Sequence, residues 1–352
     1  MSDSRSQTDR IIQDVEIKLK NYFLEVEDDR LKKLTAEKIV ERPFSTIVQL
    51  QAQTSTKSRR FVMKTLKHHP SNKIFIESGN QALVEYNILN DLYPKFRNIE
   101  KCSVPCPIAV IPEFETYIME FVEGQLLIDE LRWDRYFSSR RKFAELQEHF
   151  YNSGRWLRHF QEITGVEEAG LEVLLQSLDR AKSILRLIHV SAYPGWPKNL
   201  TSTVKSVLDN KLRELSGAGI PASGRHSDFQ PLNILAGRGG ITVIDFMGYK
   251  RDCVAVDPLS MLVHLEDEER SLTASCRRVG VLRERFLEGY GEIRRVPSAA
   301  LFICEAMQRI VSIWGNISAL NKHIHHKWEA KECIRRHVKW LVNERERKYL
   351  WP

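Results

Sequence analysis

The chain has 352 residues, of which 42% are apolar and 28% charged, an ordinary composition for a globular protein with a sizeable core. It contains no run of 18 apolar residues, so no membrane span is predicted, and its polar first residues lack the pattern of a secretory signal. Its six cysteines are too scattered for a disulfide framework. We therefore expect a cytoplasmic protein of two domains or of one large domain with two lobes.

The net charge of +7 is unevenly distributed. Residues 271–352 hold 16 Lys+Arg and 8 Asp+Glu, hence +8, so residues 1–270 sum to about −1. A basic segment can attract an anionic ligand, a nucleic acid or a membrane surface, and Trp340 and Trp351 lie among its last cations. A C-terminal helix that packs on the core explains the same pattern. No zinc spacing or RNA motif accompanies the charge, so no nucleic-acid partner is expected.

The N-terminal part changes pattern once. Residues 11–40 are predicted to form a helix, because apolar residues recur at helical spacing among charges. Two short alternating stretches, Ser45–Gln53 and Phe61–Leu66, follow on either side of a polar turn. This arrangement predicts an antiparallel hairpin.

A lysine and a glutamate occupy unusual places in this region. The alternation of the second strand puts Lys64 on one face between the apolar Val62 and Leu66. The next stretch predicts a helix that ends at Pro94 and carries Glu85 on its apolar stripe. A buried glutamate without a partner is costly, so Lys64 is its predicted partner, although a lysine that protects a sheet edge explains Lys64 alone.

The rest of the chain is mostly helical in pattern. TYIMEFVEG predicts a strand and a turn, and helical periodicity dominates from Leu126 onward. The exception is residues 225–250, where HSDFQPLNIL and ITVIDF flank a glycine turn and predict two short strands. The predicted organisation is an N-terminal helical segment at 1–40, a β-rich lobe with one helix at 41–119, and a larger helical lobe at 120–352.

Three small oxygen-bearing side chains gather in this exceptional region. Asp228 and Asn233 lie five residues apart with a proline between them, and Asp245 ends an apolar run. A loop that caps itself explains the first two. Asp245 is harder to explain in this way, because an acid placed directly after Thr-Val-Ile is costly unless it binds a ligand.

Five pieces of the chain follow the order of a protein-kinase-like fold: VMK, a helix glutamate 21 residues later, MEFVEG, HSDFQPLNIL and VIDF. Together they resemble the aminoglycoside phosphotransferase and choline kinase superfamily, whose catalytic stretch reads HGDxxxxNIL before a VIDF or VIDW strand. The resemblance covers residues 45–265. It implies a bilobal α+β fold, with a small antiparallel sheet and one helix in one lobe and mostly helices in the other.

The resemblance also implies an activity, the transfer of the γ-phosphate of ATP to a hydroxyl group with the help of Mg²⁺. It makes Asp228 the catalytic base and Asn233 and Asp245 the magnesium ligands, since hard oxygen donors suit this ion. It makes Lys64 the lysine that holds the α- and β-phosphates, and Glu85 the residue that fixes that lysine.

Other positions match less specific parts of the family pattern. The resemblance makes His226 a brace of the catalytic loop, and the backbone from Glu120 to Val122 the hinge that binds adenine. The stretch ERPFSTIV contains no glycine where protein kinases have a glycine-rich loop. Ser45 or Thr46 would supply the phosphate contacts there, and the choice between ATP and GTP stays open.

Two features favour a small-molecule or carbohydrate acceptor over a protein. Only 11 residues separate Asp245 from Asp257, which leaves no room for an activation loop that docks a peptide. Ser227 stands where regulated protein kinases carry an arginine beside the catalytic aspartate. Met261 departs from the family, which often has a second aspartate after Asp257, so local geometry there is expected to differ.

The identity of the acceptor stays open. The basic C-terminal segment argues mildly against a polycationic aminoglycoside, whereas the acidic run from Glu266 to Glu269 argues for one unless it is a solvated surface. His323–His326 lacks a defined fourth metal ligand and is interpreted as surface. The alternative function is a catalytically inactive, kinase-like binding or regulatory protein whose basic C-terminal region binds an anionic partner.

Overall fold

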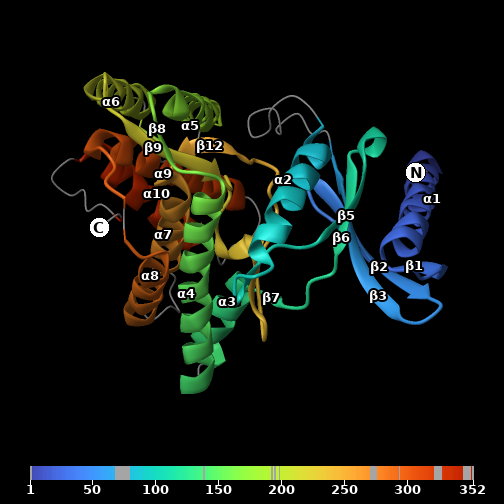
Figure 1. The fold of residues 1–352 in the computed structure, drawn as a ribbon. Helices are drawn as coiled ribbons and strands as arrows, with labels where there is room; N and C mark the ends of the chain where they lie inside the picture. The colour runs from blue at the N-terminus through green and yellow to red at the C-terminus, as the bar shows by residue number, and fades with distance from the viewer. Residues whose placement is uncertain are drawn as a thin grey trace. The chain divides into compact units, whose positions relative to one another are not determined.

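The structure is a computed structural model that describes residues 2–67, 80–137, 139–191, 193, 196–197, 199–269, 276–292, 294–320, 327–343 and 350 (Figure 1). The chain forms two compact units. The N-terminal unit comprises Met1–Gly124 and Thr242–Tyr249, and the C-terminal unit comprises Gln125–Ile241 and Lys250–Pro352. The His323–His326 run lies outside the described residues.

The N-terminal unit is built on a five-stranded antiparallel sheet of strand order β1-β2-β3-β6-β5. The predicted hairpin is confirmed, because β2 and β3 pair along their length. Lys64 of β3 lies opposite Ile47 of β2 on one side and Tyr117 of β6 on the other, so its strand is central and not an edge. The strands are β1 (Leu31–Glu41), β2 (Ser45–Thr54), β3 (Ser58–Leu66), β5 (Pro107–Ile111) and β6 (Thr116–Glu120).

The helix predicted for residues 11–40 is wrong beyond Val26. Helix α1 covers Ser2–Val26, and the chain then turns at Asp28, which has a φ of 49°, into strand β1. The Asp29 carboxylate fixes this turn by accepting from the N–H groups of Arg30 and Ser55 at 2.7 and 3.1 Å. Strand β1 is an edge strand whose lysines and glutamates face solvent, and such a composition looks helical until its pairing with β2 is known.

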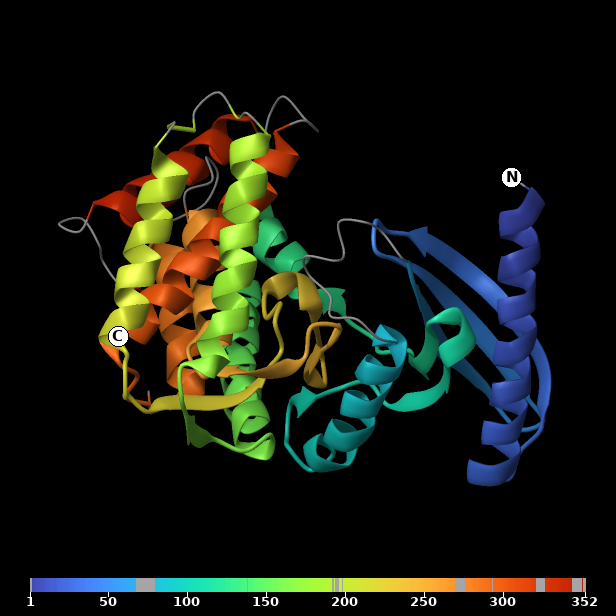
Figure 2. The same ribbon diagram turned by 90° about the horizontal axis from the view of Figure 1, so that it is seen from above.

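Helix α1 packs on one face of the sheet, as both ribbon views show (Figures 1 and 2). Its buried residues recur every four positions, as an amphipathic helix requires. They meet Phe61 and Met63 of β3, and the rings of Phe23 and Phe61 lie 5.8 Å apart, edge to face. Because side chains alternate along a strand, Lys64 points to the opposite face, away from α1. The buried residues of α1 are Ile11, Val15, Leu19 and Phe23.

Helix α2 (Gln81–Phe96) contacts β3, β5 and β6. It continues past Pro94, contrary to the sequence prediction, because a proline near a helix C-terminus removes a single hydrogen bond. The buried Phe96 anchors the last turn, and the Arg97 N–H still bonds to the Tyr93 carbonyl at 3.1 Å. At the other end, the Asn80 side chain accepts from the Leu83 N–H at 2.9 Å and caps the helix.

The Asn80 cap sets the first prediction. Asn80→Ala is expected to lower the free energy of unfolding by about 1 kcal/mol, because one N–H of the first turn loses its acceptor. Chemical denaturation measures the change. Asn90→Ala is the control, since Asn90 is exposed within the same helix and caps nothing. Equal stability of Asn80→Ala and the wild type would contradict the role of the cap.

The C-terminal unit is mostly helical, as predicted. Its two short strand systems are the sheet β12-β9-β8 and the pairing of β7 with β10. The helices are α3 (Leu127–Phe137), α4 (Arg140–Ile163), α5 (Glu172–Val190), α6 (Leu200–Glu214), α7 (Val256–Glu269), α8 (Cys276–Tyr290), α9 (Ser298–Ala319) and α10 (Lys327–Val342). The strands are β7 (Gln125–Leu126), β8 (Glu167–Ala169), β9 (Ile220–Arg225), β10 (Ile234–Gly237) and β12 (Lys250–Cys253).

The two strands expected around the glycine turn are present as β10 and β11 (Gly240–Val243). The end of β11 belongs to the N-terminal unit, where it lies beside β4 (Cys102–Ser103), and the hydroxyls of Ser103 and Thr242 bond at 2.7 Å. The loop that follows β11 therefore delivers Asp245 to the N-terminal unit.

Two glycines let α4 and α8 approach closely. A Cβ atom on Gly154 would overlap the Phe286 carbonyl, and one on Gly289 would overlap the Tyr151 carbonyl. These helices carry the hydrophobic wall beneath the loop between β9 and β10, where Trp156 stacks on Phe229 at 5.6 Å. Small residues at the crossing thus position the loop indirectly.

The basic C-terminal helix packs on the core. In α10, Trp340 is 5% exposed, stacks on Phe302 at 5.4 Å and lies under the Arg309 guanidinium at 4.6 Å. The packed interpretation therefore holds for Lys327–Val342, and Trp351 lies outside the described residues. No helix in the described part of the chain is both long and apolar enough to span a bilayer.

Candidate active site

Lys64, Glu85 and Asp245 meet in the N-terminal unit. The Lys64 Nζ lies 3.1 and 2.9 Å from the two Glu85 carboxylate oxygens and 2.9 Å from the Asp245 Oδ1. The Lys64 side chain is 6% exposed and that of Glu85 is fully buried. The predicted partnership of Lys64 with Glu85 is confirmed, and a buried glutamate on the apolar stripe of α2 is thereby explained.

Neighbouring charges and burial have opposite effects on the pKa values of Lys64 and Glu85. Burial alone would lower the pKa of Lys64, but the nearby Asp245 and Glu85 carboxylates outweigh it and raise that pKa. Burial raises the pKa of Glu85, while Lys64 and a hydrogen bond from the Tyr117 hydroxyl oppose the rise. Lys64 is therefore cationic at neutral pH, and Asp245 is the more exposed of its two partners, at 31%.

Glu85 also holds the loop that carries Asp245. Its Oε1 accepts from the Phe246 N–H at 2.9 Å. Asp245 itself has a φ of 71°, in the left-handed region, where aspartate is one of the few non-glycine residues found. This conformation directs the Asp245 carboxylate toward Lys64. Asp245 follows β11, and the sequence predicted that an acid at this position needs a ligand.

Asp228 and Asn233 meet in the C-terminal unit, on the loop between β9 and β10. The Asn233 Nδ2 donates to the Asp228 carbonyl at 2.9 Å and to its Oδ2 at 2.7 Å, and the Gln230 Nε2 donates to Oδ1 at 2.7 Å. The one-turn 3₁₀ helix Pro231–Asn233 sets this spacing. The loop does cap itself, and the same bonds fix Asn233 by its nitrogen, which turns its amide oxygen away from Asp228.

Asp257 braces the start of this loop. Its carboxylate accepts from the His226 N–H at 2.7 Å and from the Ser227 N–H at 3.1 Å. Ser227 has a φ of 78°, a left-handed conformation that glycine adopts most readily. His226 is fully buried, with its ring 6.0 Å from that of Phe229, as a structural histidine requires.

The buried Asp257 carboxyl sets a prediction on pH. Burial raises its pKa to about 6, although Arg225 and the two N–H groups oppose the rise. Between pH 4 and 6 the folded state then binds more protons than the unfolded state, so the contribution of Asp257 to the free energy of unfolding falls as pH rises, by about 3 kcal/mol. Asp257→Asn should remove this dependence.

Urea denaturation of wild type and Asp257→Asn between pH 4 and 7 measures the effect. An asparagine cannot accept from both N–H groups as well, so kcat in any phosphotransfer assay should also fall by about tenfold or more. The control is Asp179→Asn, an exposed carboxylate on α5. Parallel stability curves for wild type and Asp257→Asn would show that Asp257 does not titrate in this range.

A buried charge network lies beneath the loop and was missed in the sequence. The Arg225 Nη1 donates to the Asp252 Oδ2 at 2.7 Å and to the Ser177 Oγ at 2.6 Å, and both charged side chains are at most 5% exposed. Each residue lies at or near the end of a short strand, where polar residues are common, so neither one alone indicates a buried ion pair. Their pairing depends on the register of β9 with β12, which no local pattern reveals.

The residues predicted to contact the nucleotide lie in the strands of the N-terminal sheet and beyond the end of β6. Ser45 is buried at the start of β2, and the Thr46 hydroxyl donates to Glu41 at 2.9 Å. The Glu120 N–H is bonded to the Cys106 carbonyl at 2.9 Å, so a purine would meet the backbone beyond it, at Val122. The roles of Ser45, Thr46, Glu120 and Val122 stay predictions.

Models of known protein families and curated protein sequences give no match to the chain. Solved structures do. A glucosamine kinase in complex with glucosamine, ADP and inorganic phosphate is 14% identical with a TM-score of 0.58, and the match covers 89% of this chain and 83% of that one. Choline kinase LicA from Streptococcus pneumoniae is 13% identical with a TM-score of 0.54, covering 94% and 99%.

A Ralstonia eutropha protein described as an aminoglycoside phosphotransferase is 14% identical with a TM-score of 0.56, covering 92% of this chain and 95% of that one. The fold is therefore that of the aminoglycoside phosphotransferases and choline kinases, and the predicted α+β, kinase-like architecture is confirmed.

Proposed function

We propose that the protein is an ATP-dependent phosphotransferase that moves the γ-phosphate to a hydroxyl of a small molecule or carbohydrate. The observation that carries the proposal is the group of Lys64, Glu85 and Asp245 in one unit, together with the Asp228–Asn233 loop in the other. A buried lysine held by two carboxylates is costly as a mere structural element. It is useful where a polyphosphate is bound.

Each residue has a distinct task in the proposed reaction. Asp228 accepts the proton of the acceptor hydroxyl while a new P–O bond forms to that oxygen and the bond from the γ-phosphorus to ADP breaks. Lys64 holds the phosphates of the nucleotide, and Glu85 keeps Lys64 in place. Bound Mg²⁺ would neutralise the charge that develops on the phosphate oxygens.

The donor set fits Mg²⁺. Asp245 offers a carboxylate, and the Asn233 amide is oriented so that its oxygen is the ligand atom. Among the described residues no group of three or more His, Cys, Asp or Glu is arranged to hold a metal ion. Asp245 of the N-terminal unit and Asn233 of the C-terminal unit are each proposed to supply one ligand, with phosphate oxygens and water as the others. Lys64 would have to yield part of its contact with Asp245 when the ion binds.

A second candidate is a kinase-like binding protein without activity. The observation that favours it is the β1–β2 connection, where the Arg42 N–H bonds to the Ser45 carbonyl at 2.8 Å across a tight turn with no glycine. Such a turn offers few free N–H groups to phosphates. Its anionic partner would be bound by basic residues of the C-terminal region.

An ATP-consumption screen with Mg²⁺ tests the proposal. The acceptors are sugars, amino alcohols and aminoglycosides, with GTP as a second donor, and the Asp228→Asn variant serves as the blank. Thermal unfolding with Mg·ATP separates the two candidates, because a nucleotide at 100 times its Kd stabilises the folded state by about 2.7 kcal/mol. Absence of any nucleotide shift together with absence of turnover would favour the inactive binding protein.

A cytoplasmic location is part of the same proposal. Cys102, Cys253, Cys304 and Cys333 are buried as free thiols, and Cys106 is a half-buried one. Free thiols and a need for ATP both suit a reducing compartment. The oligomeric state is left open.

A further inference from the structure

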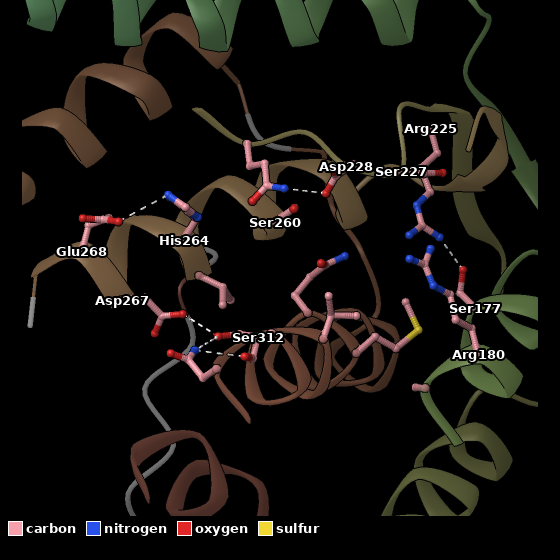
Figure 3. A pocket seen from close by; sticks show the side chains of 18 residues that line it. Ser177, Arg180, Arg225, Ser227, Asp228, Ser260, His264, Asp267, Glu268 and Ser312 are labelled. Carbon is pink, nitrogen blue, oxygen red and sulfur yellow. Dashed lines mark hydrogen bonds and ion pairs between the residues drawn. The ribbon is translucent and has the colours of Figure 1, made fainter. Parts of the chain in front are cut away.

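A cavity of about 360 Å³ in the C-terminal unit opens beside Asp228. Helices α5, α7 and α9 and the catalytic loop form its walls (Figure 3). We call it the Asp228 pocket, and it is the cavity in which an acceptor hydroxyl would reach the catalytic base. Its size is that of a small-molecule site.

The pocket lining combines hydrogen-bonding groups with apolar side chains such as Val263, Met307 and Val311. Among the described residues that line it, none is phenylalanine, tyrosine or tryptophan. Quaternary ammonium groups are bound in proteins by faces of aromatic rings, so this lining suits choline poorly. The polar side chains instead suit a compound with several hydroxyl groups. They include Ser227, Gln230, Ser260, Gln308, Ser312 and Asn316.

Two arginines share the wall nearest Asp228. Figure 3 shows the guanidinium groups of Arg180, from α5, and Arg225, from β9, facing each other. Arg225 is fixed from behind by Asp252 and Ser177. Arg180 experiences the charges of Arg225, Asp228 and Asp252, and burial together with Arg225 lowers its pKa to about 10. Because a second guanidinium group faces that of Arg180 in the pocket wall, an anion in the pocket would offset the repulsion between the two.

The carboxylates on the far wall have partners within the protein. Asp267 lies 2.9 Å from the Arg336 Nη2 and 2.8 Å from the His337 Nε2, and these partners, with the Ser312 hydroxyl, outweigh burial and lower the pKa of Asp267 to about 2. Glu268 lies 3.8 Å from the His264 Nε2. Two residues of the acidic run Glu266–Glu269, which suggested a polycationic acceptor, therefore already have partners within the protein. The arginine wall is the better anchor for a ligand charge.

We propose that the acceptor is a polyhydroxylated compound with an anionic group, a carboxylate or a phosphate, which Arg180 binds next to the hydroxyl that faces Asp228. This assignment rests on the proposed phosphotransferase function and narrows its substrate class. Arg180 would form a forked, charge-assisted pair of hydrogen bonds with the anion. Such a pair favours an anionic sugar or polyol over its neutral and amino counterparts.

The test compares wild type, Arg180→Met, Arg180→Lys and the control Arg186→Met, an exposed arginine on the same helix. Calorimetry without nucleotide, at fixed ionic strength, measures binding of D-glucuronate, D-glucose 6-phosphate, D-glucose and D-glucosamine. The two anionic probes separate carboxylate from phosphate. We expect at least one to bind, and Arg180→Met to weaken it about 10- to 100-fold, with partial recovery in Arg180→Lys and no change in Arg186→Met.

Turnover of the same probes with Mg·ATP distinguishes the proposal of an anionic acceptor from the phosphotransferase activity on which it rests. A preference of the wild type for glucosamine or glucose, unchanged in Arg180→Met, would overturn the anionic acceptor and leave the phosphotransferase in place. Equal anion binding by wild type and Arg180→Met would overturn it as well. Binding that depends on Arg180, without ATP consumption on any probe, would support the anion site and count against the proposed activity. Thermal unfolding of each variant confirms that it is folded.

Discussion

Asp228→Asn is expected to lower kcat by about 10²-fold or more, while the Kd for Mg·ATP changes little. An amide cannot accept the proton that the acceptor hydroxyl loses as it attacks phosphorus. The Asp228 carboxylate lies at the Asp228 pocket, whereas the lysine that would hold the phosphates belongs to the other unit, so nucleotide binding should persist. Single-turnover kinetics measures the first quantity, and nucleotide titration the second.

The asparagine variant needs a matched control, because both Asp228 oxygens accept hydrogen bonds in the loop. Asp129→Asn makes the same chemical change on the exposed surface of α3 and should leave kcat unchanged. Gln230→Ala removes one of the two donors and keeps the carboxylate, so it reports the effect of a loosened loop. Equal turnover by Asp228→Asn and the wild type would remove Asp228 from the mechanism.

Lys64→Met is expected to destabilise the protein by about 3–5 kcal/mol at neutral pH, because it leaves the fully buried Glu85 without its cation. The penalty should shrink as pH falls. Without Lys64 the pKa of Glu85 in the folded state lies further above its unfolded value, so the folded state takes up a proton first and the charge disappears. Urea denaturation from pH 5 to 8 measures this trend.

The double variant Lys64→Met with Glu85→Gln separates stability from function. It removes the uncompensated charge, so much of the lost stability should return, while phosphate binding and turnover should not. Lys67→Met is the control, since Lys67 pairs with Glu41 at the surface, where an ion pair contributes about 1 kcal/mol or less. A Lys64→Met protein as stable as the control variant would contradict the buried pair.

The parts of the fold that sequence predicted well are those in which a local pattern and the tertiary structure agree. Ser45–Thr54 and Ser58–Leu66 alternate because one face of each strand packs in the core with α1. The other face of Ser58–Leu66 meets α2, and that of Ser45–Thr54 carries glutamines. Strand β1 was missed because its exposed lysines and glutamates carry no burial signal and its conformation depends on β2. Helix α2 continues past the predicted end at Pro94 because the buried Phe96 holds its last turn.

The residues of the candidate site also differ in how well the sequence predicted them. Lys64 and Glu85 were recognisable as a pair because each is a charge among apolar neighbours, and such a charge needs a partner. Arg225 and Asp252 are equally buried, yet each lies at the end of a short strand, where polar residues are common. Arg180 carries no local signal either, since it is one of several cations in an amphipathic helix. Only the assembled pocket gives it a role.

The loop that delivers Asp245 has a consequence for the order in which the protein can fold. Lys64 and Asp245 are 181 positions apart, and the N-terminal unit is completed by Thr242–Tyr249. At a synthesis rate of roughly 5–20 residues per second, the first 124 residues wait many seconds on the ribosome before that segment exists. A Lys64–Glu85 pair that forms during this interval forms without Asp245. Closing so long a loop is also slow, so the acidic ligand is expected to join its lysine among the last events of folding.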